Sequence, residues 1–232
     1  MKAAYDEIAD WYENEFLASQ RSADSDAEYA DSLGIDQALV ELLGTGQGMC
    51  LEVGCGTGIY AERVALLGWT PVGIDISSGM LRYASERLLV THGDGLRLPF
   101  ATDSLPTVIT VMTHTDVADY EALLREVHRI LRPGGIFVHV GVHPCFCGEF
   151  ADRSGSPNVL IRPGYLENGW TPALGPEHGH LGRDGQVRHK VGAGHQSLAD
   201  LLNLFPDTGF TVERFFEGSA PTPITLSIRA IA

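Results

Sequence analysis

Basic residues are scarce in this chain, and their scarcity limits its partners. Its 232 residues hold 16 Lys and Arg against 30 Asp and Glu, for a formal net charge of -14 at pH 7. A duplex-binding protein needs clustered cations to displace counterions from phosphates, and an anionic membrane surface also attracts basic segments. We therefore expect neither partner. A small-molecule substrate is expected instead, because one pocket can differ in charge from the whole molecule.

Long apolar runs and cysteines are also few. No run approaches the roughly 20 apolar residues that cross a bilayer. The first seven residues become acidic too early for a secretory leader, so we expect a cytoplasmic protein. Its four cysteines, Cys50, Cys55, Cys145 and Cys147, are then expected to stay reduced, without a disulfide framework.

Short apolar strands alternate with helices through the middle of the chain. The strands are predicted over 49–53, 71–75, 89–92, 107–112 and 136–140. The helices between them are predicted over 58–67, 78–88 and 120–131. This alternation favours a parallel sheet that is covered by helices on both faces.

Other elements are predicted on either side of this alternation. Two helices are expected before it, over 5–17 and 26–43. Residues 142–196 are rich in Gly, Pro and His and have little periodicity, and a long segment of this kind is usually functional or disordered. A helix over 197–205 and strands over 210–216 and 224–228 follow. The last two strands are expected to close the sheet as an antiparallel hairpin.

A glycine-rich turn follows the first predicted strand, at residues 52–58 (EVGCGTG). Glycine lets the backbone approach a ligand closely, and doubly wound sheets bind ligands at the carboxyl ends of their strands. Ile59 stands where the pyrophosphate fingerprint G-x-G-x-x-G has its last glycine. Three acids, Glu52, Asp75 and Asp94, fall at successive strand ends. They suit a cationic ligand that carries a ribose and an adenine.

At these residues the chain resembles class I S-adenosylmethionine-dependent methyltransferases, and more closely the group that includes the quinone-biosynthesis methyltransferases. The matching segments are EVGCGTG at 52–58, DISSGML at 75–81, GDGLRLPF at 93–100 and LRPGG at 131–135. The resemblance covers about residues 5–141. It implies S-adenosylmethionine as methyl donor and S-adenosylhomocysteine as product. It also implies that Asp75 holds the ribose and Asp94 the adenine amine. The cofactor-binding residues implied are Tyr12, Glu52, Gly54, Cys55, Gly56, Gly58, Asp75, Ile76, Met80, Gly93, Asp94, Gly95 and Thr113.

With this resemblance, the expected architecture is a single α/β domain over 1–232. Its doubly wound, Rossmann-like sheet has seven strands, mostly parallel, with the antiparallel hairpin at the C-terminus. The expected parts are a helical lid at 1–45, a cofactor-binding core at 46–141, a substrate-side insert at 142–196, and a C-terminal helix and hairpin at 197–232.

Two histidines are candidate general bases for methyl transfer. His114 follows the fourth predicted strand, close to where the family places donor and acceptor, and His143 follows the fifth. Either could take a proton from an oxygen or nitrogen nucleophile. The alternative is that each only packs or caps a loop.

The segment His143-Pro144-Cys145-Phe146-Cys147 also raises the question of a metal site. Zinc sites usually need four ligands, so His178 or His180 would have to contribute. We expect no metal, because small sulfur side chains more often pack as ordinary core residues.

The leading hypothesis is therefore methyl transfer to a small apolar metabolite, expected in secondary metabolism. The alternative is a cyclisation or pericyclic rearrangement of a polyketide-like substrate on the same scaffold, with S-adenosylmethionine absent or structural, because fold does not fix function. A non-catalytic S-adenosylmethionine-binding module is a third hypothesis. The substrate, the acceptor atom and the oligomeric state, a homodimer included, are left open.

Overall fold

The structure is a computed structural model that describes residues 3–18, 31–155, 158–173, 185–218 and 221–232. Part of the predicted helix over 26–43 lies outside these residues, as do His178 and His180. Among the residues described, no helix has the length and apolar character needed to cross a membrane.

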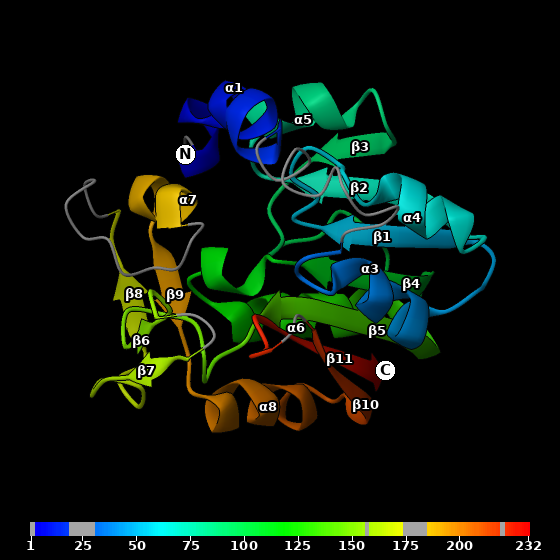
Figure 1. The fold of residues 1–232 in the computed structure, drawn as a ribbon. Helices are drawn as coiled ribbons and strands as arrows, with labels where there is room; N and C mark the ends of the chain where they lie inside the picture. The colour runs from blue at the N-terminus through cyan, green and yellow to red at the C-terminus, as the bar shows by residue number, and fades with distance from the viewer. Residues whose placement is uncertain (1–2, 19–30, 156–157, 174–184, 219–220) are drawn as a thin grey trace.

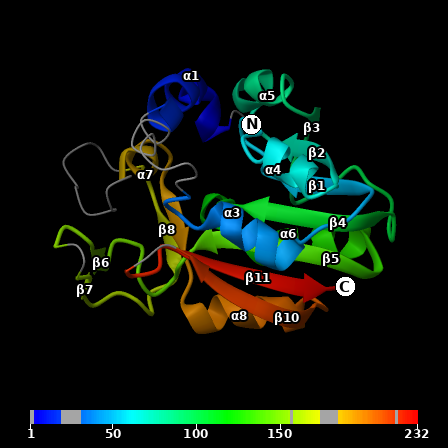
Figure 2. The ribbon, with the colours of Figure 1, turned by 45° about the vertical axis from the view of Figure 1, so that its right-hand side comes forward.

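A seven-stranded sheet runs through the molecule. Its strands are β1 (Met49–Val53), β2 (Thr70–Asp75), β3 (Leu89–His92), β4 (Leu105–Val111), β5 (Leu131–Val142), β10 (Thr211–Gly218) and β11 (Thr225–Ile231). They lie in the order β3-β2-β1-β4-β5-β11-β10 (Figures 1 and 2). The first five are parallel, whereas β11 is antiparallel to both β5 and β10. The predicted mostly parallel sheet with a C-terminal hairpin is confirmed. Its strand order reverses between β1 and β4, where sheets of this kind bind ligands.

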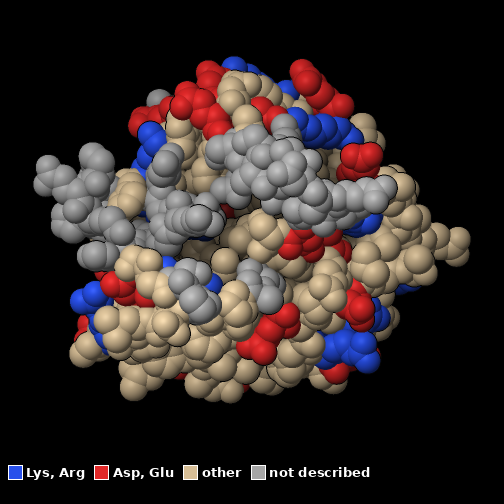
Figure 3. Space-filling model, in the orientation of Figure 1, with Lys and Arg blue, Asp and Glu red and all other residues tan. Residues whose placement is uncertain are grey.

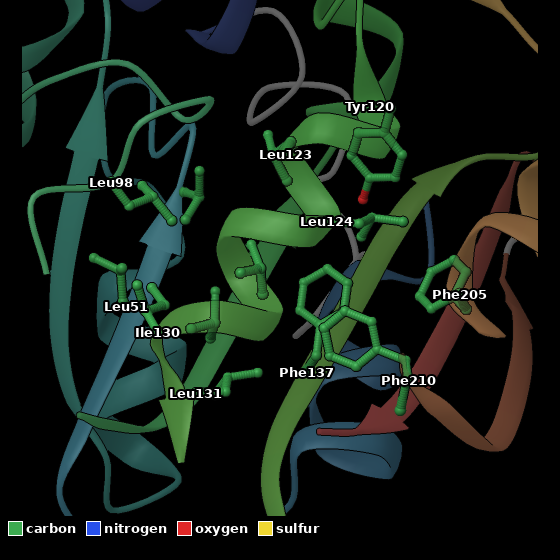
Figure 4. Packing of buried hydrophobic residues seen from close by; sticks show 14 of the residues in the cluster. Leu51, Leu98, Tyr120, Leu123, Leu124, Ile130, Leu131, Phe137, Phe205 and Phe210 are labelled. Carbon is green, nitrogen blue, oxygen red and sulfur yellow. The ribbon is translucent and has the colours of Figure 1, made fainter. Parts of the chain in front are cut away.

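Helices cover both faces of this sheet. They are α3 (Ile35–Ala38), η3 (Leu39–Leu43), α4 (Ala61–Leu66), α5 (Ser78–Ala84), α6 (Tyr120–Ile130) and α8 (Leu198–Asp207). Buried side chains of α3, η3 and α4 pack together with those of β1, β4 and β5 in one core cluster. Those of α6 and α8 pack in another, with Leu51 and Phe137 (Figure 4). Ile228 of β11 belongs to the same cluster. The two clusters bury opposite faces of the strands, as the alternating strand and helix pattern predicts.

Helix α6 illustrates how the sequence specifies these elements. Its buried residues Tyr120, Leu123, Leu124, Val127 and Ile130 recur at helical spacing and face the core. The carboxylate of Asp119 caps its first turn by accepting the Ala122 N–H at 2.9 Å. The helix ends at Ile130, before a proline that cannot continue it.

The N-terminal helical turns η1 (Ala4–Glu7), α1 (Ala9–Trp11) and η2 (Tyr12–Phe16) lie beside α5 (Figure 1). Oδ1 of Asp6 accepts the Gly79 N–H and the Ser77 hydroxyl, each at 2.8 Å. Arg87 pairs with the buried carboxylate of Glu13 and donates to the Thr57 carbonyl at 2.6 Å. The segment expected to act as a lid is therefore anchored to α5 and to the glycine-rich turn.

The predicted insert is more regular than its sequence indicates. It contains β6 (Ala151–Asp152), β7 (Leu160–Ile161), β8 (Gly169–Thr171), α7 (Gly185–Val191) and β9 (Ala193–His195). β6 pairs with β7 and β8 with β9 in two small antiparallel sheets. Strands of two or three residues are too short to show an alternating pattern, which is why sequence periodicity does not find them. β9 packs against η4 (His114–Asp116), the turn that follows β4.

Candidate active site

A cavity of about 2060 Å³ opens at the carboxyl ends of β1, β2 and β4. Its walls come from the glycine-rich turn, the N-terminal helical turns, η4 and the insert. The predicted cofactor residues that line it are Tyr12, Gly54, Gly56, Gly58, Asp75, Ile76, Met80, Gly93, Asp94, Gly95 and Thr113. His114 lines it too, whereas Glu52, Cys55 and His143 do not.

The glycine-rich turn needs its glycines for two different reasons. Gly54, Gly56 and Gly58 all have positive φ, at 75°, 52° and 75°. A Cβ on Gly54 would lie 2.6 Å from the Thr113 side chain, and one on Gly58 would lie 2.5 Å from Leu88. A Cβ on Gly56 would meet nothing within 4 Å. Packing therefore excludes a side chain at Gly54 and at Gly58. At Gly56 the absence of a side chain leaves the backbone open to the cavity.

Asp75 ends β2 and holds the turn in place. Its Oδ2 accepts the Gly56 N–H and its Oδ1 accepts the Ser77 N–H, each at 2.8 Å. Burial raises the pKa of this carboxyl, and the two backbone hydrogen bonds oppose that rise. Each carboxylate oxygen has a second lone pair, so Asp75 can still accept ligand hydroxyls.

Glu52 lies in β1, outside the cavity wall, and is 4% exposed. Burial, with a smaller contribution from Asp75, raises the pKa of its carboxyl to about 8. The carboxyl is therefore mostly protonated at neutral pH in the ligand-free protein. A cation bound nearby would favour its ionised form.

Three further cofactor candidates, Asp94, Thr113 and Cys55, differ in the contacts that they make. Asp94 is exposed after β3, where its Oδ1 accepts the Leu96 N–H at 2.9 Å. Thr113 donates to the Val53 and Val111 carbonyls at 3.2 and 3.1 Å, which ties β4 to the turn. Cys55 packs instead with Leu81 and Ala84 of α5.

A partly buried ion pair that the sequence did not indicate joins three elements at the cavity. Arg188 of α7 pairs with Asp116 of η4, and the Tyr5 hydroxyl donates to the same carboxylate at 3.2 Å. Burial raises the pKa of Asp116, and the Arg188 charge opposes that rise. No local signal marks these residues, because the contacts join segments far apart in the chain.

His114, the first base candidate, is 8% exposed and is a cavity residue. Burial and the nearby His139, Arg188 and His195 hold its pKa well below 6.5. The ring is therefore neutral at physiological pH. A low pKa also makes it a weak base.

His143, the second candidate, is buried at the end of β5 and has both ring nitrogens occupied. Its Nδ1 accepts the Cys145 N–H at 3.1 Å, and its Nε2 lies 2.8 Å from the Glu217 carboxylate. Because it also lies outside the cavity wall, the geometry does not favour it as a base.

His195 is the other histidine among the described residues of the cavity wall, and the sequence did not single it out. Its Nε2 donates to the Tyr165 carbonyl at 2.7 Å. The described residues contain no group of three or more His, Cys, Asp or Glu that could hold a metal ion.

Residues 51–139 match the family model described as a methyltransferase domain. Demethylmenaquinone methyltransferase of Streptomyces griseus subsp. griseus is 32% identical over 126 residues, which are 53% of this chain and 51% of that protein. The chain thus spans about half the length of this relative.

The fold is similar to that of an S-adenosylmethionine dependent methyltransferase from Mesorhizobium loti, with a TM-score of 0.66 and 22% identity over 85% of this chain and 96% of that one. The cyclase SpnF aligns with a TM-score of 0.55 and 22% identity, over 79% of this chain and 59% of that one. At such identities the likeness establishes the fold alone.

Proposed function

We propose that this chain, which carries a class I S-adenosylmethionine-dependent methyltransferase domain, transfers a methyl group from S-adenosylmethionine to a small apolar metabolite. The observation that carries the proposal is the cavity itself. Its lining combines the open backbone of Gly56 and the carboxylates of Asp75 and Asp94 with apolar side chains of the insert such as Trp170, Val187 and Val191.

The residues present fit this methyl donor. Gly56 leaves room for a ligand against the backbone, and Asp75 can accept hydroxyl donors beside it. Asp94, exposed at the next strand end, can accept from an exocyclic amine. Glu52 behind the turn is mostly protonated without ligand, and a sulfonium or an ammonium group bound nearby would favour its negatively charged form. Tyr12, Ile76 and Met80 add apolar surface.

When bound, S-adenosylmethionine supplies a methyl group on a sulfonium, so that the nucleophile's electron pair forms the new bond while the S–CH₃ bond breaks and S-adenosylhomocysteine is left. The chain then has to orient the acceptor, exclude water and hold the acceptor's proton. His114 and His195 are the candidate groups for contact with the acceptor, since both line the cavity. Proton removal by a positioned base contributes roughly 10²–10⁴-fold.

We place the acceptor against the insert. Apolar side chains of the insert line that part of the cavity, among them Pro144, Trp170, Val187 and Val191, together with polar ones that include Glu149, Arg153, Arg188 and His195. A concave, mostly apolar wall with few polar groups is typical of small-molecule sites. It supports an apolar substrate, and a role in secondary metabolism remains part of the proposal.

Nucleic acid is not among the proposed partners. On the face that Figure 3 shows, acidic and basic side chains of the described residues are interspersed, which is not the clustered basic surface that a duplex requires. The proposal also keeps the protein cytoplasmic. A homodimer is compatible with it but carries no part of the argument.

Cyclisation or rearrangement of a polyketide-like substrate is the second candidate function, because the cyclase SpnF has the same fold. Both functions use the same cavity, so the product discriminates them. We expect calorimetry to detect binding of S-adenosylmethionine and S-adenosylhomocysteine. Mass spectrometry of reactions with candidate acceptors should detect a product heavier by one methylene unit. A product of unchanged mass would favour the cyclase, and absence of binding to either ligand would falsify the methyltransferase proposal.

A further inference from the structure

His114 has one buried and one open ring nitrogen. Its Nδ1 is buried without a hydrogen-bond partner in the described structure. Its Nε2 is not among the buried unpartnered atoms, and the ring belongs to the cavity wall. Nε2 is therefore the atom that His114 offers to a bound molecule.

His139 of β5 lies directly behind His114. It is fully buried, and its Nε2 also lacks a partner. The two ring centroids are 5.0 Å apart. His114 Nδ1 and His139 Nε2 each lie 2.5 Å from the point where a Cβ on Gly141 would stand, so no more than twice that distance separates them. Gly141 thus keeps the space between two otherwise unpartnered nitrogens free of a side chain.

The far side of His139 determines which of its nitrogens carries the proton. Its Nδ1 lies 2.7 Å from the Tyr120 hydroxyl and 3.4 Å from the Thr110 hydroxyl, and the two hydroxyls are 3.3 Å apart. If Thr110 donates to Tyr120 and Tyr120 donates to Nδ1, both hydroxyl protons have acceptors. The reverse direction leaves the Thr110 proton without one, which is costly in a buried site. His139 Nδ1 is therefore an acceptor, and the ring proton is on Nε2.

We infer that His139 Nε2–H donates to His114 Nδ1 through one water molecule and thereby fixes His114 as a hydrogen-bond donor that presents Nε2–H to the cavity. The opposite tautomer of His114 would set two N–H groups against each other in a buried space. A fixed N–H donor at this wall recognises an oxygen of the acceptor molecule, either a carbonyl or an anionic oxygen. His139 and Tyr120 are positioning residues in this arrangement. The identity of the bound molecule rests on the proposed function, whereas the tautomer does not.

His195 has the complementary arrangement. Its Nε2–H donates to the Tyr165 carbonyl, so Nδ1 is the nitrogen that is free of a proton in the neutral ring. Burial lowers the pKa of His114, and Arg188 and His195 add to that effect, so its ring does not gain a second proton at neutral pH. Of the other charged or titratable groups nearby, Asp116 pairs with Arg188 and also accepts the Tyr5 hydroxyl. This arrangement leaves His195, the other described histidine of the cavity wall, as the candidate base and assigns His114 the role of donor.

Nitrogen NMR of the ligand-free full chain labelled with ¹⁵N-histidine tests this inference without a substrate. The two ring nitrogens of a neutral histidine have distinct shifts, so each tautomer is read directly. His114→Gln and His139→Leu assign two of the nine histidines by loss of signal. His143 and His195 serve as internal references, because their contacts already require the Nε2–H form.

We expect His114 and His139 both in the Nε2–H form at pH 7, and a mixture of tautomers at His114 in His139→Leu. A His114 ring with Nδ1–H, an imidazolium, or a mixture of tautomers in the parent protein would overturn the inference. The parent spectrum suffices if His139→Leu does not fold. Calorimetry with S-adenosylhomocysteine on the same sample separates the outcomes, because loss of ligand binding with the predicted tautomers contradicts only the proposed function.

Discussion

At the residue scale, Asp75 is where the glycine-rich turn and the proposed ribose site meet. Asp75→Ala removes the acceptor of the Gly56 and Ser77 N–H groups as well as that of the ligand. We expect S-adenosylhomocysteine binding to weaken by about 1.5–3 kcal/mol, the usual size for hydrogen bonds to a charged group. Calorimetry measures this loss of binding free energy. Asp207→Ala, which changes an exposed carboxylate of α8, is the matched control, and equal affinities in a folded Asp75 variant would remove the ribose assignment.

Glu52 makes the ligand-free protein sensitive to pH. Its folded pKa is about 8, above the ordinary value of 4.5. The stability that this carboxyl contributes is therefore full below pH 4.5 and is lost as the pH rises through 8. Between about pH 5 and pH 8, the free energy of unfolding should fall more in the parent than in Glu52→Gln, by roughly 2–4 kcal/mol.

Urea denaturation across this pH range tests the prediction, with Glu86→Gln as the exposed control. Parallel pH curves for the parent protein and Glu52→Gln would mean that Glu52 is ionised in the ligand-free fold.

The two cavity histidines should respond differently to substitution. Glutamine at position 114 keeps an N–H donor near Nε2, so His114→Gln should keep turnover within about tenfold, whereas His114→Leu should lose roughly 10²–10³-fold. His195→Gln should lose roughly 10²–10⁴-fold, because an amide cannot act as a base. Steady-state rates with an acceptor found by mass screening measure these losses. Equal losses in both His114 variants would indicate that His114 is the base instead.

At the scale of elements, the partly buried pair Arg188–Asp116 joins α7 to η4, and Tyr5 adds the N-terminal turns. Arg188→Met leaves a partly buried carboxylate without its cation and should lower the free energy of unfolding by about 2–4 kcal/mol, somewhat less than for a fully buried pair. Arg188→Met with Asp116→Leu removes both charges and should recover most of that loss.

Urea denaturation of the single and double variants measures this coupling. Additive losses in the double variant would show that the pair does not act as a unit. Hydrogen exchange should also become faster in α7 and η1 of the single variant, since both lose their shared attachment.

At the scale of the whole molecule, ligand binding should stabilise the fold. A ligand at 100 times its Kd stabilises by about 2.7 kcal/mol, and for a chain of this size each kcal/mol raises Tm by about 2–4 °C. S-adenosylhomocysteine should therefore raise Tm by roughly 5–10 °C, measured by scanning calorimetry. At the same concentration the shift should be smaller in Asp75→Ala, and an unmoved parent Tm would count against a ligand site that spans the lid and the sheet.

The sequence by itself determined the fold class and the ligand-binding edge of the sheet. Apolar periodicity in α6 and the glycines at 54, 56 and 58 are local signals, because each reflects a requirement of neighbouring residues in the chain. Asp75 and Asp94 could be placed at the cavity because the carboxyl ends of parallel strands meet at one edge.

Only the tertiary structure decided which groups face the cavity and in what state. It buried Glu52 behind the turn, engaged both nitrogens of His143, and brought His195 and Arg188 from the insert to the wall. It also set His139 behind His114 across Gly141. Burial and hydrogen-bond direction depend on residues far apart in the chain, and they fix the pKa and the tautomer of a group whose sequence position shows neither.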